Sequence, residues 1–384
     1  MKLLFKSIGL LCLFICAAFF ISSSTKPVIN KPAASKIQVA ILLDVSGSMD
    51  GLIEQAKAQL WNMVNTMGKA KCTGDVTPSI EIALYEYGRT TNDAKQGYVK
   101  KINGFINDMD SLSQNLFSLK TNGGDEYCGH VIYSSLNELQ WDNAPENYKV
   151  IFIAGNEDFL QGDIKYTQSC SEAKNKKVIV NTIYCGDKMQ GIREHWNLAG
   201  ECGNGSYTNI NQDAKAEEIP TPYDSMLYVM NGRLNSTYVS YGYNGASYQM
   251  KQQSMDVANA SMSKEAQLKR IKTKSNAKVY KNGGWDLVDA QKDGTLDFAK
   301  LDKNTLADSL KNKSTDDIKK IVAQKSMERS ATQQSIDSLN IKRDAFIAAA
   351  KAANAANKNN APTLETEVER IIKEQAKRFN MIIQ

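Results

Sequence analysis

The stretch ILLDVSGSMD, residues 41–50, joins the end of a buried strand to a turn and the start of a helix. It completes the apolar run Ile37–Leu43, which is typical of a parallel strand buried on both faces. Three oxygen-bearing side chains follow in alternation: Asp44, Ser46 and Ser48. Such residues at the carboxyl end of a strand either cap the next helix or hold a ligand.

Strands and helices alternate from residue 37 to residue 215. Further strands are predicted at Ser79–Tyr87, Lys149–Ala154, Lys177–Tyr184 and Gly205–Ile210. Helices are predicted after Met49 and at Phe105–Leu119, Gly129–Leu139, Tyr166–Asn175 and Ile192–Ala199. This order predicts an α/β fold with a mostly parallel sheet and helices on both faces.

The composition fits a globular protein. Of 384 residues, 42% are hydrophobic and 23% charged, and the formal net charge is +5. Lys and Glu are spread along the chain, with no basic block interleaved with aromatics, so nucleic-acid binding is not expected.

The first residues read as a targeting segment. A basic start with Lys2 and Lys6 precedes the apolar run Ile8–Ile21, which is shorter than the ~20 residues of a membrane span. Residues 1–24 are therefore predicted to be a signal peptide, with no membrane span after its cleavage. Lipidation at Cys16 is left open. Residues 25–36 read as a linker.

The cysteines that follow the signal peptide predict disulfides in an exported protein. They are Cys72, Cys128, Cys170, Cys185 and Cys202. No CxxC pair occurs, which argues against a zinc site. The sequence does not fix the pairing, although we favour Cys185–Cys202 and Cys72–Cys128.

The second half of the chain differs in character. Residues 216–300 are expected to be a mixed connecting region that packs on the first domain, with a β-like piece at 277–290. Residues 301–384 are expected to be helical. A long helix should begin after Ser314, which is followed by acids in its first turn. Its apolar seam is interrupted by charges, Arg329 and Arg343 among them, and a last helix is expected at 364–383.

The side chains of DVSGS suit a hard divalent cation. Hydroxyl and carboxylate oxygens are the ligands that Mg²⁺ prefers, and Gly47 permits a tight turn. We expect one ion, Mg²⁺, with Ca²⁺ or Mn²⁺ as alternatives. So few charged ligands would leave the ion able to accept a carboxylate from a partner.

DVSGS after an apolar strand resembles the metal-ion-dependent adhesion site of von Willebrand factor type A domains. The resemblance implies a doubly wound sheet over residues 37–215 and places Asp44, Ser46 and Ser48 on the first metal loop. In the family a second loop supplies a Thr. Here that loop reads TNGGDE, which makes Asp125 or Thr121 the candidate ligand.

The third loop of the family normally gives an Asp in an Asp-Gly turn. This sequence has Ala154-Gly155-Asn156 there, followed by Glu157 and Asp158, which are the remaining candidate ligands. The departure leaves open whether the third loop still completes the site.

The wider sequence resembles an exported bacterial subgroup of type A proteins. The resemblance rests on strings such as IAGNEDFLQGDIKYTQSCSEA, VIVNTIYCGD and WDLVDA. It implies a location in the periplasm or at the cell surface of a bacterium, and it implies no settled activity.

These observations favour a binding module over an enzyme. The two histidines, His130 and His195, neighbour no nucleophile motif, and no nucleotide-binding motif is present. We expect a protein partner that offers an Asp or Glu carboxylate, within an envelope assembly. The alternatives are a structural envelope protein with a degenerate, metal-free site and, less favoured, an envelope hydrolase.

Overall fold

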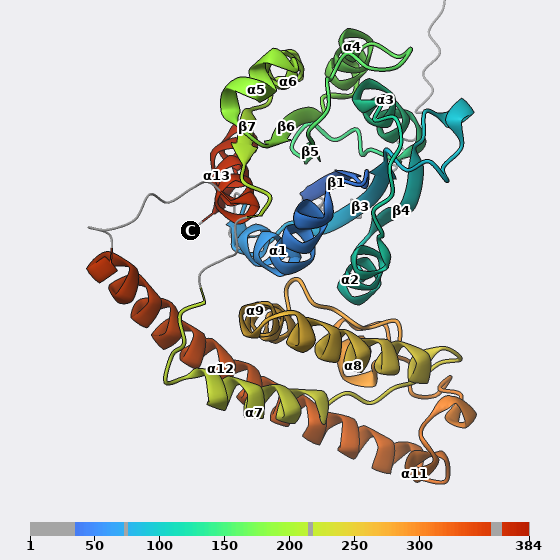
Figure 1. Ribbon diagram of the computed structural model, residues 1–384. Helices are drawn as coiled ribbons and strands as arrows, with labels where there is room; N and C mark the ends of the chain where they lie inside the picture. The colour runs from blue at the N-terminus through green and yellow to red at the C-terminus, as the bar shows by residue number, and fades with distance from the viewer. Residues whose placement is uncertain (1–34, 73–75, 214–217, 355–362, 384) are drawn as a thin grey trace, which may run out of the picture. The chain divides into compact units, whose positions relative to one another are not determined.

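The computed structural model describes residues 35–72, 76–213, 218–354 and 363–383 (Figure 1). The predicted signal peptide, Cys16 and almost all of the linker lie outside the described residues. Within those residues, no helix combines the length and the apolar character that crossing a membrane requires.

A six-stranded sheet forms the centre of the α/β part. Its strands are β1 (Lys36–Asp44), β3 (Ser79–Tyr87), β4 (Lys100–Ile106), β5 (Tyr148–Gly155), β6 (Ile179–Cys185) and β7 (Tyr207–Ile210). They lie in the order β4-β3-β1-β5-β6-β7, and of the six only β4 runs antiparallel to its neighbour. This is the doubly wound arrangement, so the predicted fold class is confirmed.

Helices cover both faces of the sheet (Figure 1). One face carries α1 (Asp50–Gly68), α2 (Met109–Ser118) and α13 (Leu364–Ala376), and the other carries α3 (Cys128–Glu138), α4 (Tyr166–Lys176) and α6 (Trp196–Cys202). The short helix α5 (Lys188–Arg193) precedes α6. In β1, Val39 and Leu43 belong to one apolar cluster and Ala40 and Leu42 to the other, as the two-residue period of a strand requires.

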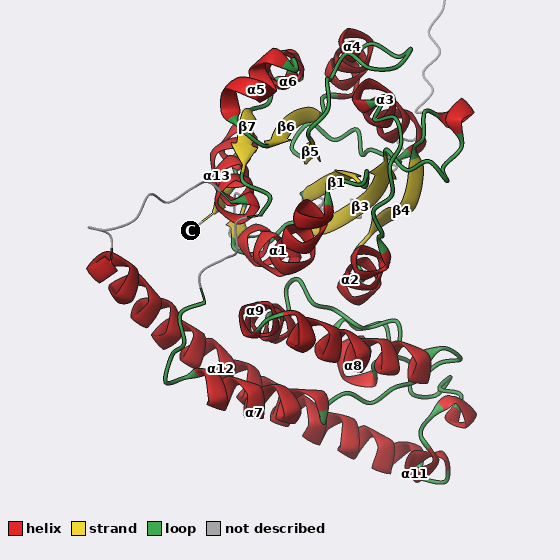
Figure 2. Cartoon of the chain, in the orientation of Figure 1, coloured by secondary structure: helices red, strands yellow, loops and turns green. Residues whose placement is uncertain are grey.

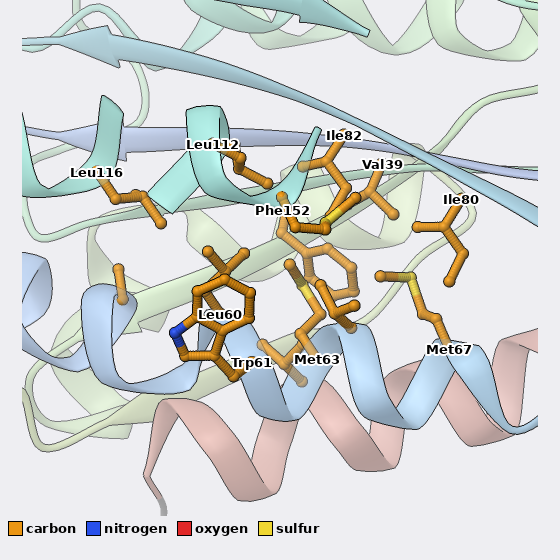
Figure 3. Packing of buried hydrophobic residues seen from close by; sticks show 14 of the residues in the cluster. Val39, Leu60, Trp61, Met63, Met67, Ile80, Ile82, Leu112, Leu116 and Phe152 are labelled. Atoms are coloured by element: carbon orange, nitrogen blue, oxygen red, sulfur yellow. The ribbon is translucent and has the colours of Figure 1, made fainter. Parts of the chain in front are cut away.

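The face beneath α1 has the larger core. Figure 3 shows Leu60, Trp61, Met63 and Met67 packed among side chains of the strands and of α2. Their strand partners are Val39, Ile80, Ile82 and Phe152, and those from α2 are Leu112 and Leu116.

The prediction of a helix over Phe105–Leu119 is wrong at its start. The chain forms the edge strand β4 as far as Ile106, and α2 begins at Met109. Asp108 is the N-cap, since its carboxylate accepts hydrogen bonds from the backbone N–H groups of Asp110 and Ser111. The edge strand escaped prediction because lysines, Asn103 and a glycine interrupt its apolar residues.

The favoured disulfide pairs are also wrong. Cys170 is bonded to Cys202, with 5.7 Å between their Cα atoms, and Cys72, Cys128 and Cys185 are free thiols. The reason is the packing of α4 against α6, which brings Cys170 beside Cys202 on the same face of the sheet. Cys185, at the end of β6, belongs to the cluster on the opposite face.

The chain between β7 and α13 is mainly helical (Figure 2). It contains α7 (Asp224–Asn235), α8 (Gly245–Met262), α9 (Lys264–Ser275), α10 (Leu287–Lys292), α11 (Asp308–Lys311) and α12 (Thr315–Asn354). The predicted β-like piece at 277–290 is wrong, because it forms turns, a single bridge between Ser240 and Asp286, and the start of α10. Asp286 caps that helix by accepting a hydrogen bond from the Asp289 N–H.

The long helix predicted after Ser314 is confirmed as α12, and the Ser314 hydroxyl accepts a hydrogen bond from the Asp317 N–H. The arginines that interrupt its apolar seam attach it to the other helices. Arg329 lies 2.6 Å from Asp286, and Arg343 lies 3.0 Å from Asp224. Both arginines are buried, so the charges that weaken the sequence pattern are contacts that fix the position of the helix.

The last helix returns to the sheet. α13 packs on α1 and β7, and the Gln375 amide reaches two strands. Tyr148 donates to Gln375 Oε1 at 2.9 Å, and Gln375 Nε2 donates to Asn181 at 2.7 Å. The core of the α/β part therefore contains residues from both ends of the described chain.

A buried arginine joins the helices between β7 and α13, called the helical part below, to the α/β part. Arg270, on α9, lies 2.7 Å from Asp110 on α2 and 2.6 Å from Asp256 on α8, and its guanidinium stacks over the Trp61 ring. Lys274 also pairs with Asp256, at 2.7 Å, and burial lowers the pKa of this lysine to about 8. Opposite charges within this cluster stabilise one another in the absence of water.

We expect Arg270→Met to lower the free energy of unfolding by about 3–5 kcal/mol, because it leaves Asp110 buried without its cation. Arg370→Met is the matched control, since the Arg370 side chain is 50% exposed and its ion pairs lie at the surface. It should cost less than about 1 kcal/mol. Urea unfolding measures both variants, and equal losses would show that the buried cluster adds nothing beyond ordinary surface pairing.

Candidate metal centre

The carboxylate of Asp44 lies at the centre of the site. Asp44 is the last residue of β1 and is fully buried. Its Oδ1 accepts a hydrogen bond from the Ser46 N–H at 2.7 Å, while Oδ2 is buried and has no hydrogen-bond partner among the described residues. Burial raises the pKa of this carboxyl to about 7, and the negative charge of Glu157 contributes to the rise.

The two serines of DVSGS lie together on the outer side of Asp44. The hydroxyl oxygens of Ser46 and Ser48 are 3.3 Å apart, and Asn156 Nδ2 donates to Ser48 Oγ at 3.2 Å. Ser46 is buried and Ser48 is exposed. The oxygen atoms thus extend from a buried carboxylate to a hydroxyl at the surface.

Glu126 is a second buried carboxylate that the sequence did not single out. Its Oε2 is buried and, like Asp44 Oδ2, has no hydrogen-bond partner among the described residues. A Cβ added to Gly88 would lie 2.9 Å from Asp44 Oδ1 and 2.8 Å from Glu126 Cγ, so the two acidic side chains flank the same glycine. Gly88 has a φ of +84°, a conformation that glycine adopts without strain.

The second loop lies against DVSGS. Asn122 N–H donates to Val45 O at 2.9 Å, and Thr90 N–H donates to Gly123 O at 2.9 Å. Of the predicted ligands on this loop, Asp125 is exposed and accepts a hydrogen bond from the Tyr127 hydroxyl at 3.4 Å. Thr121 donates to the carboxylate of Asp50.

Close packing around Gly155 leaves no room for a side chain in the third loop. A Cβ at this position would lie 2.5 Å from the Tyr87 hydroxyl oxygen and 3.0 Å from Asp44 Oδ2. The Tyr87 hydroxyl donates to Ala154 O at 3.0 Å and is fixed there. An aspartate at 155 would therefore have no room, and the next residue, Asn156, contacts Ser48 instead.

The two acidic residues that follow Asn156 make contacts of their own. The Asp158 carboxylate accepts a hydrogen bond from the Leu160 N–H at 2.9 Å and lies 3.1 Å from His195 Nδ1. Glu157 is exposed, and its carboxylate lies 3.5 Å from the Gln161 amide nitrogen. Glu157 is close enough to influence the charge of Asp44, as the pKa of Asp44 indicates.

The side chains gathered around Asp44 offer oxygen atoms as their main potential ligands. Burial raises the pKa of the nearby thiols of Cys128 and Cys185, so both are neutral and are poor metal ligands. In the described part of the chain, no three or more His, Cys, Asp and Glu side chains are grouped so that they could hold a metal. An ion bound here would depend on two carboxylates, together with hydroxyl, amide and water oxygens.

The strand order and the DVSGS loop at the carboxyl end of a central strand are those of a doubly wound α/β fold, the arrangement that the resemblance to von Willebrand factor type A domains implies. No protein-family model matches the chain, and no curated protein is detectably similar to it in sequence.

Several solved structures are similar to this chain. The mussel byssus proximal thread matrix protein 1 with a zinc-occupied MIDAS motif is 13% identical, with a TM-score of 0.35 over 46% of this chain and 42% of that one. An aerotolerance-related membrane protein from Bacteroides fragilis is 14% identical, with a TM-score of 0.32 over 46% of this chain and 93% of that one. A von Willebrand factor type A structure from Catenulispora acidiphila is 15% identical, with a TM-score of 0.35 over 47% and 39%. The chain thus spans less than half the length of the mussel protein.

We expect Gly155→Ala to destabilise the protein by about 1–3 kcal/mol, because its methyl group would displace the Tyr87 hydroxyl or Asp44. Gly123→Ala is the control, since a Cβ there meets no atom within 4 Å. Thermal and urea unfolding measure the difference. A Gly155→Ala protein as stable as the control would contradict the close packing described here.

The raised pKa of Asp44 predicts a pH dependence of stability without metal. The folded carboxyl, with a pKa of about 7, holds its proton more tightly than the unfolded one, at 3.8. The free energy of unfolding should therefore fall as the pH rises from about 4 to about 7. Asp44→Asn should remove this part of the fall, and Asp125→Asn should not. Urea unfolding in EDTA across this range tests it, and an unchanged slope in Asp44→Asn would contradict it.

Proposed function

We propose that this protein is an extracytoplasmic protein-binding module, an adhesion or scaffold unit that uses a metal-ion-dependent site to bind a carboxylate of its partner. The observation that carries the proposal is the pair of buried oxygens, Asp44 Oδ2 and Glu126 Oε2, without hydrogen-bond partners among the described residues. Buried polar atoms in folded proteins are nearly always satisfied, and a bound cation is one way to satisfy them.

The residues present fit one divalent ion. Asp44, Ser46, Ser48 and Glu126 would hold it, with Asn156 positioned by Ser48. Hydroxyl and carboxylate oxygens with few charges favour Mg²⁺, which retains several water molecules. When bound, the ion supplies an exposed positive charge that a partner's Asp or Glu carboxylate can coordinate in place of water.

The chain's own residues shape that contact. Ser48 is the exposed member of the group, so a partner would approach from its side. The loop containing Asp125 and Tyr127 begins against DVSGS, through Asn122 and Gly123, and would form part of the rim. We do not include the other predicted ligands in this set, because each contacts another group in this structure. They are Thr121, Asp125, Glu157 and Asp158.

The helical residues 224–354 would position the module within an envelope assembly. The proposed location, the periplasm or surface of a bacterium, rests on the signal-like residues 1–24 and on the resemblance given by the sequence. The leading alternative is a structural envelope protein in which Asp44 and the serines serve only the turn. The Ser46 N–H bond to Asp44 is the observation that supports this alternative.

Calorimetric titration with MgCl₂ separates the two. We expect one ion per chain for the wild type, and at least a tenfold loss of affinity in Asp44→Ala and in Glu126→Gln. Asp125→Asn is the matched control for the neighbouring acid and should bind nearly as the wild type does, because Asp125 is exposed and contacts Tyr127. Absence of divalent-ion binding, or binding that survives Asp44→Ala, would favour the metal-free alternative.

A further inference from the structure

The outward face of α12 carries a stripe of uncharged side chains. It runs from Met327 to Ala352 in alternating steps of four and three residues, with methionine, alanine, glutamine, serine, isoleucine and three further alanines in that order. All of these side chains are exposed, and Met327 and Ile341 are 69% and 71% exposed. We call these residues the α12 stripe. Their spacing is the a and d pattern of a coiled-coil helix, and the stripe is about 38 Å long at 1.5 Å per residue.

The α12 stripe lies opposite the side of the helix that packs on the rest of the chain. That inner side contains Arg329, Ile336 and Arg343, which are buried and seven residues apart. Each of them is two residues from members of the stripe, which is about 200° around the helix. Figure 1 shows α12 along the side of the helical part that lies away from the sheet. The stripe is thus open to a second molecule from outside.

The exposed charges in this part of α12 flank the stripe. Between residues 330 and 353 they are Asp337, Lys342, Asp344 and Lys351, and each directly precedes or follows a stripe residue. The solvent face of a surface helix normally carries its charges along the middle of that face. Charges at the flanks of an uncharged seam are instead the pattern through which coiled-coil helices select their partner and orientation.

Two of the flanking charges, Asp337 and Lys342, have no ion pair among the described residues. Nearer the start of α12, three lysines pair with acids three residues away. Asp337 and Lys342 have no opposite charge three or four residues away, so α12 itself does not pair them. Asp337 uses Oδ1 to accept a hydrogen bond from the Ser275 hydroxyl at 3.0 Å, which leaves Oδ2 for another donor. Lys272, whose charge also acts on Asp337, is itself paired with Asp344 at 2.7 Å.

We propose that the α12 stripe is the interface of a parallel dimer, in which it packs in register against the same stripe of a second copy of this chain. Asp337 precedes a stripe residue and Lys342 follows one, so they lie on opposite flanks and five residues apart. In a parallel pair opposite flanks meet, which places Asp337 of each copy beside Lys342 of the other. In an antiparallel pair like flanks meet, and Asp337 would face the acidic Asp344 of the other copy. The charges therefore favour the parallel arrangement.

Sedimentation equilibrium of the full chain in EDTA tests the proposal without the metal centre, on which it does not depend. We expect a reversible dimer with a dissociation constant of about 1–100 μM, because the seam is narrow and most of its side chains are small. Met327→Lys/Ile341→Lys should weaken the dimer at least tenfold, since it places charges inside the seam. Met250→Lys/Val257→Lys is the matched control on α8, where the side chains are 63% and 66% exposed, and it should associate as the wild type does.

Two results of this measurement would overturn the proposal. One is a wild type that stays monomeric at about 0.1 mM, well above the expected dissociation constant. The other is an equal loss in the stripe and control variants, which would indicate non-specific association of exposed apolar side chains. All four substituted side chains are exposed, so the variants should fold, and urea unfolding checks that they do.

A charge exchange tests the orientation. Lys342→Glu and Asp337→Lys should each weaken the dimer at least threefold, and the double variant Asp337→Lys/Lys342→Glu should restore it. Asp337→Lys and the double variant both lose the Ser275 hydrogen bond, so the difference between them reports the pair alone. A double variant as weak as Asp337→Lys would overturn the parallel arrangement.

A disulfide cross-link tests the register. In a parallel dimer residue 327 lies beside residue 327 of the other copy, whereas in an antiparallel one it lies beside Ala352. Met327→Cys should therefore form a disulfide-linked dimer under mild oxidation. Val229→Cys, at a position on α7 that is 52% exposed, is the control and should not. No cross-link at 327, or equal cross-linking in both variants, would overturn the proposed register.

Discussion

The burial of β1 on both faces is the constraint on which the rest of the structure depends. With β3 and β5 on either side and helices above and below, the strand is buried along almost all of its length, its last residue Asp44 included. That end places a carboxylate where it has no water to solvate it. Tyr87, Gly88 and Gly155 from the neighbouring strands and turns then close around it. The space beside the buried Asp44 carboxyl therefore restricts which residues can occupy positions 88 and 155 of the adjoining loops.

In the helical part, buried ion pairs join the helices to one another. Its helices share apolar contacts and are also joined by buried arginines, each paired with acids of other helices. Buried ion pairs add little net stability compared with well-packed apolar groups, but an unpaired charge is costly. An arrangement that separates Arg270 from Asp110, or Arg329 from Asp286, is therefore disfavoured. These contacts therefore favour the observed packing of α7, α8, α9 and α12 over one that would separate the pairs.

The features that could be predicted from the sequence are those that depend on local apolar periodicity and on capping or turn residues. The parallel strands, the DVSGS loop and the helix after Ser314 follow from runs of apolar residues and a capping serine. It did not predict β4, whose apolar residues are interrupted, or the Cys170–Cys202 bond, which depends on helix packing. Asp125 and Glu126 are adjacent acids, and only the path of the backbone decides which one is buried. Likewise, no local pattern shows that Tyr87 fills the space beside Gly155.

The return of α13 to the sheet has a consequence for how the chain folds. Contacts such as Leu364 with Gln55 and Gln375 with Tyr148 join residues more than two hundred positions apart. Closing so long a loop costs entropy before any contact compensates for it, and folds dominated by distant contacts form slowly. During synthesis, the part of α1 that α13 covers stays exposed until α13 has emerged.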